Sequence, residues 1–231
     1  VDALEHCRCS DDVAVIVVTG AGEAFCRGGD TTRLGGHTTP GPVEIKEQFW
    51  DRLHRIPRKL AEIDKPVIAA VNGTAMGGGF EIALACDIIV ASENATFALP
   101  EPKVGLAALA GGMHRLPRQI GMKQAMGMML TGRAVSAAEG QQLGFVNEVV
   151  PLDDLMAGAR CWADQILACA PLSIRATKQS AMQGLNEPVL KDAIEAKYSA
   201  VNDMFHSPDM IEGPTAFAEK RKPNWSGKIN K

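Results

Sequence analysis

Four stretches of consecutive hydrophobic residues, many of them β-branched, predict the strands of a buried sheet. The stretches lie at residues 13–19, 67–71, 87–91 and 145–150. Runs that are apolar at nearly every position are typical of strands covered on both faces, as in a parallel sheet. Segments of helical character alternate with them, so we expect an α/β fold in which right-handed crossovers join parallel strands.

Helical periodicity appears between and after these strands. Apolar residues recur every three or four positions over 45–60, which predicts an amphipathic helix that Pro57 should kink or split. A short apolar helix is expected at 80–86, directly after a glycine-rich turn. Ser136 and Glu139 have the spacing of a capping box, which predicts that a further helix begins there.

The pattern changes near residue 150, where the strands cease and helical segments follow one another. These segments are broken near three prolines, Pro171, Pro188 and Pro208. We therefore predict a strand-and-helix core at 1–150 and a helical region at 151–231. Because Val1 already belongs to a predicted helix, the sequence leaves open a further segment upstream of it.

Composition and charge narrow the class of protein. The chain has 231 residues, 46% of them hydrophobic, and a formal net charge of -3. This length supports one large core. The acidic balance predicts no attraction to nucleic acid or to an anionic membrane. The sequence contains no apolar run long enough to span a bilayer and no signal-peptide pattern, so we expect a cytoplasmic protein.

The residues that bind metals and cofactors in other proteins do not form recognisable patterns. Six cysteines are scattered from Cys7 to Cys169 without C-x-x-C pairs or zinc-like spacing, and most have apolar neighbours, which predicts buried thiols. Glycine motifs for phosphate or dinucleotide binding are missing. We expect no metal and no separate cofactor. His54 and the other histidines are expected at surface or structural positions. Met122, Met126, Met128 and Met129 are expected in the core.

Two glutamates beside glycine-rich turns are the strongest candidates for chemistry. Glu81 follows Gly77–Gly79, and Glu101 lies between two prolines shortly before Gly105. Glycine lets the backbone approach a ligand closely because it has no Cβ. A carboxyl group at such a turn can exchange protons with a substrate whose carbonyl the turn binds. The apolar neighbours of Glu81 should raise its proton affinity.

The glycine turns themselves can supply hydrogen-bond donors. A strand, a glycine turn and a helix follow one another over 67–86, which leaves free backbone N–H groups at the start of the helix that can stabilise an oxyanion. A second turn at 24–30 can supply another donor. Taken singly, such turns more often serve close packing, and each glutamate is as readily a helix-start or surface carboxylate. Their joint occurrence favours acid–base chemistry on a carbonyl compound.

Ordered motifs along the chain carry a closer likeness. They lie at Thr19–Asp30, Asp64–Asp87, Thr131–Asn147 and Ala216–Lys222. With these motifs, nearly the whole chain resembles the enoyl-CoA hydratase/isomerase (crotonase) family. The resemblance implies a spiral of β-β-α units, with a C-terminal helical region that forms homotrimers, and trimers that often pair into hexamers. It also implies an acyl-coenzyme A thioester as the substrate.

The resemblance further implies a role for each candidate residue. Gly29 and Gly78 would donate the two N–H groups of an oxyanion hole. Glu81 would activate water for attack on C3 of a 2-enoyl-CoA, and Glu101 would deliver a proton to C2. Further substrate contacts are expected from Cys26, Asp30, Gly77, Pro100 and Leu109, and at the adenosine end from Phe217 and Lys220 of a neighbouring subunit.

One departure from the family pattern bears on the reaction. Ala108 and Leu109 stand where hydratases of the family carry Pro-Gly, so Leu109 adds bulk beside the expected water. Hydration of a 2-enoyl-CoA is the leading interpretation. A double-bond isomerase and a carnitinyl-CoA-type dehydratase remain open on the same fold. A non-catalytic member of the fold is disfavoured because both glutamates and both glycines are present.

Overall fold

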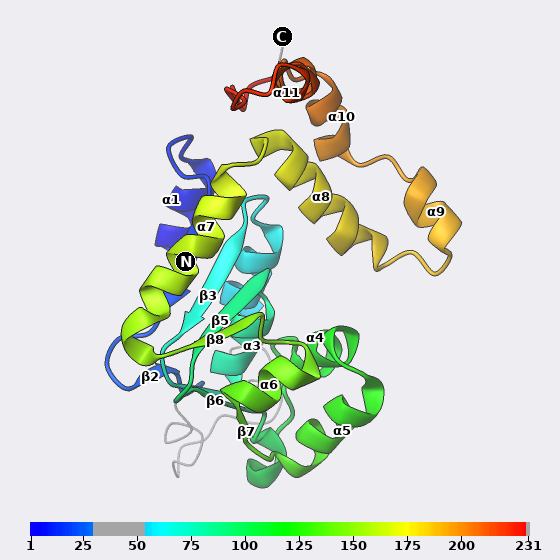
Figure 1. The fold of residues 1–231 in the computed structure, drawn as a ribbon. Helices are drawn as coiled ribbons and strands as arrows, with labels where there is room; N and C mark the ends of the chain where they lie inside the picture. The colour runs from blue at the N-terminus through cyan, green and yellow to red at the C-terminus, as the bar shows by residue number, and fades with distance from the viewer. Residues whose placement is uncertain (30–53, 230–231) are drawn as a thin grey trace. The chain divides into compact units, whose positions relative to one another are not determined.

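A computed structural model describes residues 1–29 and 54–229 of the chain. Its strands form two sheets of four strands each (Figure 1). The chain alternates between the sheets: each of the strands β1, β3 and β5 belongs to the first sheet, and the next strand along the chain is short and belongs to the second sheet. The strand pair β3–β4 leads into helix α3, which makes a β-β-α unit. The predicted spiral of such units is confirmed.

The first sheet contains the predicted hydrophobic runs. Its strands have the order β1, β3, β5 and β8, at Ile16–Thr19, Val67–Val71, Ile88–Ser92 and Glu148–Val150. Strands β3, β5 and β8 pair in parallel, as predicted. Every residue of β3 is buried. The start of β3 is fixed by Asp87, whose carboxylate accepts a hydrogen bond of 2.8 Å from the backbone N–H of Val67.

The second sheet carries the turns of interest and was not predicted. Its strands have the order β2, β4, β6 and β7, at Ala24–Cys26, Thr74–Met76, Thr96–Ala98 and Val135–Ser136. Strands β2, β4 and β6 pair in parallel, whereas β7 is antiparallel to β6. Strands of two or three residues are too short to show a hydrophobic period, which explains why the sequence pattern missed them.

Helices of the first part of the chain surround these sheets. A helix at 54–62 precedes β3 and continues through Pro57, so the predicted split at this proline is wrong within the described residues. A proline removes one backbone hydrogen bond, and the neighbouring turns can keep the helix continuous. The other helices are α1, α3, α4, α5 and α6, at Asp2–Cys9, Gly78–Leu84, Gly112–Gln119, Met122–Thr131 and Ala137–Leu143. A 3-10 helix, η2, lies at Glu101–Val104.

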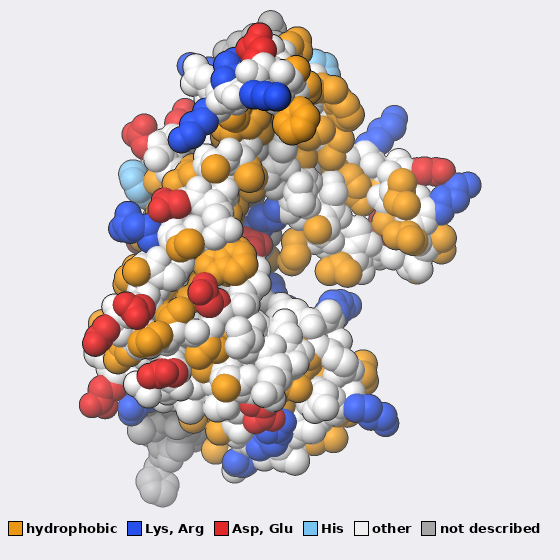
Figure 2. All heavy atoms as spheres, in the orientation of Figure 1, with side chains coloured by type: hydrophobic (Ala, Val, Ile, Leu, Met, Phe, Trp, Pro, Cys, Tyr) orange, Lys and Arg blue, Asp and Glu red, His pale blue; other side chains and the backbone are white. Residues whose placement is uncertain are grey.

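The chain downstream of β8 is helical, as the sequence pattern predicts. A 3-10 turn at Leu152–Asp154 leads into helices α7 to α11, at Leu155–Leu167, Pro171–Gly184, Leu190–Glu195, Ser199–Phe205 and Asp209–Ala218. Many of their large apolar side chains are exposed in the single chain, including those of Leu190 (75%) and Ile194 (73%) on α9. Figure 2 shows hydrophobic side chains at the surface of this part of the chain.

The chain divides into two compact units. The first contains Val1–Cys9, Val17–Ile63 and Val67–Arg160, and the second contains Ser10–Ile16, Asp64–Pro66 and Cys161–Lys231. Within the second unit, the carboxylate of Asp209 accepts hydrogen bonds from the backbone N–H groups of Ser226 and Gly227. No helix in the described part of the chain has the length and apolar character needed to cross a membrane.

Two expectations about burial are corrected. Cys86 is buried, but Cys9, Cys161 and Cys169 are exposed, and all six cysteines are free thiols. Met128 is buried on α5, whereas Met122 and Met126 on the same helix are exposed in the single chain. Apolar neighbours in sequence do not imply burial on a helix, because neighbouring residues point to different faces.

The capping box gives a testable statement about stability. The hydroxyl of Ser136 accepts a hydrogen bond of 3.2 Å from the backbone N–H of Glu139 at the start of α6, as predicted. Ser136→Ala should lower the free energy of unfolding by about 1 kcal/mol because this donor loses its acceptor. Ser136→Asp keeps a hydrogen-bond acceptor at this position, so its urea midpoint of unfolding should be close to that of the wild type. Equal urea midpoints for all three proteins, followed by circular dichroism, would contradict the cap.

Candidate active site

The two glycine turns meet because the strands before them pair in parallel. Strand β2 lies beside β4, with Ala24 opposite Thr74 and Cys26 opposite Ala75. Parallel neighbours end at the same edge of a sheet. A Cβ built on Gly28 would lie 2.8 Å from the carbonyl oxygen of Met76 and 3.1 Å from the backbone nitrogen of Gly78. The turn that contains Gly28 and Gly29 is therefore in contact with the turn that begins α3.

Steric constraints fix the turn at the start of α3. Gly77 precedes the helix with a φ of 54°, a left-handed conformation that favours glycine. A Cβ on Gly79 would lie 1.9 Å from the carbonyl oxygen of Cys26, so α3 can approach β2 this closely only with glycine there. Gly78 is the first residue of α3, and its N–H has no acceptor within the helix because it belongs to the first turn.

Glu81 is buried one turn into α3. It is 2% exposed, and its Oε1 accepts a hydrogen bond of 2.8 Å from the backbone N–H of Gly112. Burial raises the pKa of Glu81 to about 7, the Gly112 N–H opposes this rise, and the nearby charge of Glu101 adds to it. The raised proton affinity predicted from the apolar neighbours of Glu81 is confirmed in direction.

Glu101 begins η2 and faces the same glycine turn. A Cβ on Gly77 would lie 3.0 Å from Oε1 of Glu101, so the carboxyl group rests against the backbone there. Its Oε2 is buried and has no hydrogen-bond partner among the described residues. Burial raises the pKa of Glu101. A buried, unpaired carboxyl oxygen is costly, and such groups are typical of sites that bind a ligand or transfer protons.

Aromatic packing supports the helix that carries Glu81. Phe80, Phe97 and Phe145 form a buried cluster, in which ring centroids are 5.1 to 5.2 Å apart. Aromatic pairs at this separation and in tilted orientations attract one another. The cluster joins α3 to β6 and to the residues just after α6. The position of Glu81 therefore depends on segments that are distant in sequence.

A loop between η2 and α4 completes the surroundings of the glutamates. A Cβ on Gly112 would lie 2.9 Å from the Cβ of Ala108 and 3.1 Å from Oε1 of Glu81, which leaves room for glycine only. Leu109 is partly exposed in this loop. Its carbonyl oxygen accepts a hydrogen bond of 2.9 Å from Nε2 of His54, so the Nε2 nitrogen carries the proton in this contact.

Two further residues lie beside this loop. His54, expected at a surface or structural position, bonds the carbonyl of Leu109 and so has a structural role. The other residue, Arg115, was missed by sequence reasoning. Arg115, on α4, has its guanidinium near the carbonyl oxygens of Ala110 and Pro57, each at 3.5 Å. Burial lowers the pKa of Arg115, and the charge of Glu81 opposes this effect. The sequence did offer one indication of Arg115: it is a cationic residue in the first turn of a helix that begins at two consecutive glycines, Gly111 and Gly112.

The structure brings together most of the residues that the sequence singled out. Glu81, Glu101, Gly77 and Gly78 converge with the Gly28–Gly29 turn. Pro100 immediately precedes η2, and Cys26 ends β2, where its carbonyl packs against α3. Asp30 lies outside the described residues. Phe217 and Lys220 belong to the second unit, where both are exposed at the end of α11.

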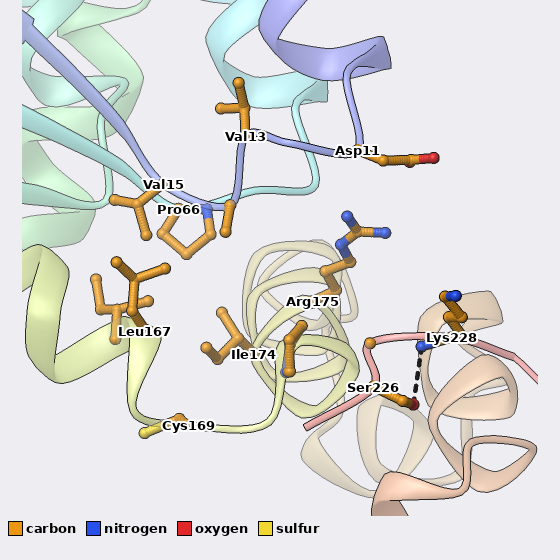
Figure 3. A pocket seen from close by; sticks show the side chains of 14 residues that line it. Asp11, Val13, Val15, Pro66, Leu167, Cys169, Ile174, Arg175, Ser226 and Lys228 are labelled. Atoms are coloured by element: carbon orange, nitrogen blue, oxygen red, sulfur yellow. Dashed lines mark hydrogen bonds between the residues drawn. The ribbon is translucent and has the colours of Figure 1, made fainter. Parts of the chain in front are cut away.

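Other potential sites have different locations or chemistry. The described residues contain no group of three or more His, Cys, Asp or Glu side chains that could hold a metal ion. A cavity of about 330 Å³ lies in the second unit, lined by apolar side chains such as Val13, Pro66 and Ile174, with Arg175 and Lys228 among its polar residues (Figure 3). None of the predicted site residues lines this cavity.

Solved structures of other proteins resemble this chain over nearly its whole length. A crystal structure of an enoyl-CoA hydratase from Bacillus anthracis superposes with a TM-score of 0.88 and 34% identity, covering 98% of this chain and 86% of that one. An enoyl-CoA hydratase from Mycobacterium marinum gives a TM-score of 0.82 and 34% identity over the same shares.

The sequence comparisons extend over the same region. A carnitinyl-CoA dehydratase from Salmonella typhi is 39% identical over 98% of this chain and 87% of its own length. The sequence profile of the enoyl-CoA hydratase/isomerase family matches residues 1–228. Together with the fold, these findings show that the chain belongs to the enoyl-CoA hydratase/isomerase family, the crotonases.

Proposed function

We propose that this crotonase-family enzyme adds water to the double bond of a 2-enoyl-CoA thioester and forms a 3-hydroxyacyl-CoA. The observation that carries the proposal is the pair of glutamates beside the glycine turn: Glu81 is buried and has a pKa of about 7, and Glu101 has a buried, unpaired Oε2. Two carboxyl groups of raised proton affinity can hold one proton between them at neutral pH. Hydration needs one ionised carboxyl group, which accepts a proton from water, and one protonated carboxyl group, which donates a proton to the substrate.

The glycine turns would bind the thioester carbonyl. The backbone N–H groups of Gly78 and Gly29 are the proposed donors, supported by the contact between their turns. Donors fixed in the backbone stabilise the negative charge that develops on the carbonyl oxygen without reorganising during the reaction. Withdrawal of electrons toward this oxygen makes C3 of the conjugated double bond electrophilic.

The glutamates would then move the protons. Ionised Glu81 accepts a proton from water as the water oxygen bonds to C3, and protonated Glu101 gives its proton to C2 of the enolate. Glu81 ends the step protonated and Glu101 ionised, so one proton must pass from Glu81 to Glu101, directly or through solvent, before the next turnover. The same groups acting in reverse would remove water from a 3-hydroxyacyl-CoA.

A second candidate function is dehydration of a carnitinyl-CoA-type substrate. The identity of 39% to the Salmonella typhi carnitinyl-CoA dehydratase favours it. Leu109, in place of a smaller residue near the expected water, also supports a different acyl group. Turnover of crotonyl-CoA, of a 3-enoyl-CoA and of carnitinyl-CoA by the purified chain separates hydratase, isomerase and dehydratase. The hydratase proposal fails if crotonyl-CoA is inert while another of these substrates reacts.

Replacing either glutamate should abolish most of the activity. Glu81→Gln and Glu101→Gln should each lower kcat by about 10²- to 10⁴-fold, because each removes one proton-transfer group but keeps the shape of the side chain. The loss of crotonyl-CoA absorbance measures the rate, and calorimetry with butyryl-CoA should show nearly unchanged binding. Glu139→Gln, at a partly exposed position of α6, is the matched control and should keep full activity. Unchanged rates in both site variants would remove the acid–base assignment.

The pKa of Glu81 predicts the shape of the pH profile. Burial raises this pKa to about 7, so Glu81 is protonated below this pH and ionised above it. The proposed step needs one proton on the pair, and the charge of Glu101 already acts on Glu81 when Glu81 titrates, so kcat/KM should fall above pH 7 by about tenfold for each pH unit. In Glu101→Gln the residual activity should instead rise as Glu81 ionises, at a pH below 7, because the neighbouring charge is removed. A wild-type profile in which kcat/KM stays flat near pH 7 would contradict the assignment.

We also propose that the chain forms a cytoplasmic homotrimer or a hexamer of paired trimers through its C-terminal helices. Ile211 and Phe217 on α11 are 73% and 87% exposed in the single chain. Contiguous exposed apolar side chains are typical of surfaces that another protein covers. Phe217 and Lys220 would then contact the adenosine end of a substrate bound by a neighbouring subunit.

The molecular mass of the protein in solution tests the proposed assembly. Light scattering should give three or six times the chain mass for the wild type, and Ile211→Asp combined with Phe217→Asp should lower it because charge is costly in an apolar interface. Met122→Asp, which introduces the same charge at an exposed apolar position of α5, should leave the mass unchanged. A monomeric wild type would refute the proposed assembly.

A further inference from the structure

Arg115 and Glu81 both contact the Ala110–Gly112 segment. A Cβ on Gly111 would lie 2.1 Å from Nη1 of Arg115, so the guanidinium packs directly against this glycine. The next residue, Gly112, donates its N–H to Glu81. The position of this short piece of backbone therefore determines whether the Gly112 N–H can reach Glu81.

The guanidinium also joins this segment to the helix at 54–62. Nη1 faces the carbonyl oxygen of Ala110 and Nη2 faces that of Pro57, both at 3.5 Å. The planar fork of arginine can bridge two carbonyl groups in this way, whereas the single ammonium of lysine cannot fix the same geometry. His54 on the same helix holds the carbonyl of Leu109. The loop beside the glutamates is therefore attached to one helix at two points.

Several titratable groups surround Arg115 and the loop that it contacts. Glu81 on α3 and Cys86, just after α3, lie near Arg115, and Glu101 at the start of η2 lies near Glu81. His54 faces the loop from the helix at 54–62. Arg115 stays protonated because arginine does not lose its proton in proteins. Among these groups it is the permanent cation, and its charge favours the ionised form of Glu81.

We propose that Arg115 is a positioning residue of the glutamate pair. It braces Ala110–Gly112 against the helix at 54–62, which keeps the hydrogen bond from Gly112 to Glu81, and it supplies a positive charge that favours the ionised form of Glu81. This role rests on the proposed hydration only through the use of Glu81 as a base. The effect of Arg115 on the ionisation of Glu81 is independent of the substrate.

The pH profile tests this role. In Arg115→Met, the limb of kcat/KM near pH 7 should move up by about one pH unit, because Glu81 loses a neighbouring positive charge, while KM changes little. Arg115→Lys keeps the charge but loses the two-point brace, so its limb should lie between those of the wild type and Arg115→Met. Arg118→Met removes a cation from the exposed face of the same helix and is the matched control. It should retain the wild-type limb.

A direct titration separates failure of this role from failure of the proposed reaction. The ¹³C signal of the Glu81 carboxyl, assigned by its loss in Glu81→Gln, should titrate at higher pH in Arg115→Met than in the wild type, with or without activity on crotonyl-CoA. Equal titration of Glu81 in folded Arg115→Met and wild type would overturn the proposal. If Arg115→Met does not fold, the titration of Glu81 is measured in Arg115→Lys instead. A Glu81 titration equal to that of the wild type in Arg115→Lys would refute the brace.

Discussion

Burying the carboxyl group of Glu81 costs free energy that must be offset locally, and the rest of the site follows from how this happens. A carboxylate removed from water favours its neutral form unless hydrogen bonds or opposite charges compensate. Here the compensation is partial, because the Gly112 N–H and the Arg115 charge oppose burial while Glu101 adds to it. A pKa of about 7 is the balance of these contributions. It is also a useful value for a group that must gain and lose a proton at neutral pH.

The second sheet determines where this balance is established. Its strands are only two or three residues long, yet the parallel pairing of β2 with β4 sets two glycine turns against each other. The contact leaves no space for a Cβ at Gly79 and little at Gly28. The glycines are therefore required for close packing as well as for their proposed role in donating backbone N–H groups. Close packing and ligand binding, the two interpretations of such turns, thus apply to the same residues.

Much of this arrangement could be predicted from the sequence, for identifiable reasons. The run at 67–71 coincides with β3 because a strand buried on both faces has a continuous apolar pattern, and Ser136 was identified because capping is local. The short strands could not be predicted, since two or three residues show no period. Arg115 was missed because its importance comes from a contact with the helix at 54–62, which is distant in sequence. Exposure of the methionines and cysteines depends on which face of a helix each residue occupies.

The cluster of Phe80, Phe97 and Phe145 has a consequence for how the protein is made. Glu81 and Glu101 leave the ribosome well before Phe145, the residue whose ring contacts both of the others. Contacts between distant segments form late, because the intervening chain must first be ordered. During synthesis, both carboxyl groups are therefore present in a nascent chain that still lacks Phe145, one of the three rings of the cluster that supports α3.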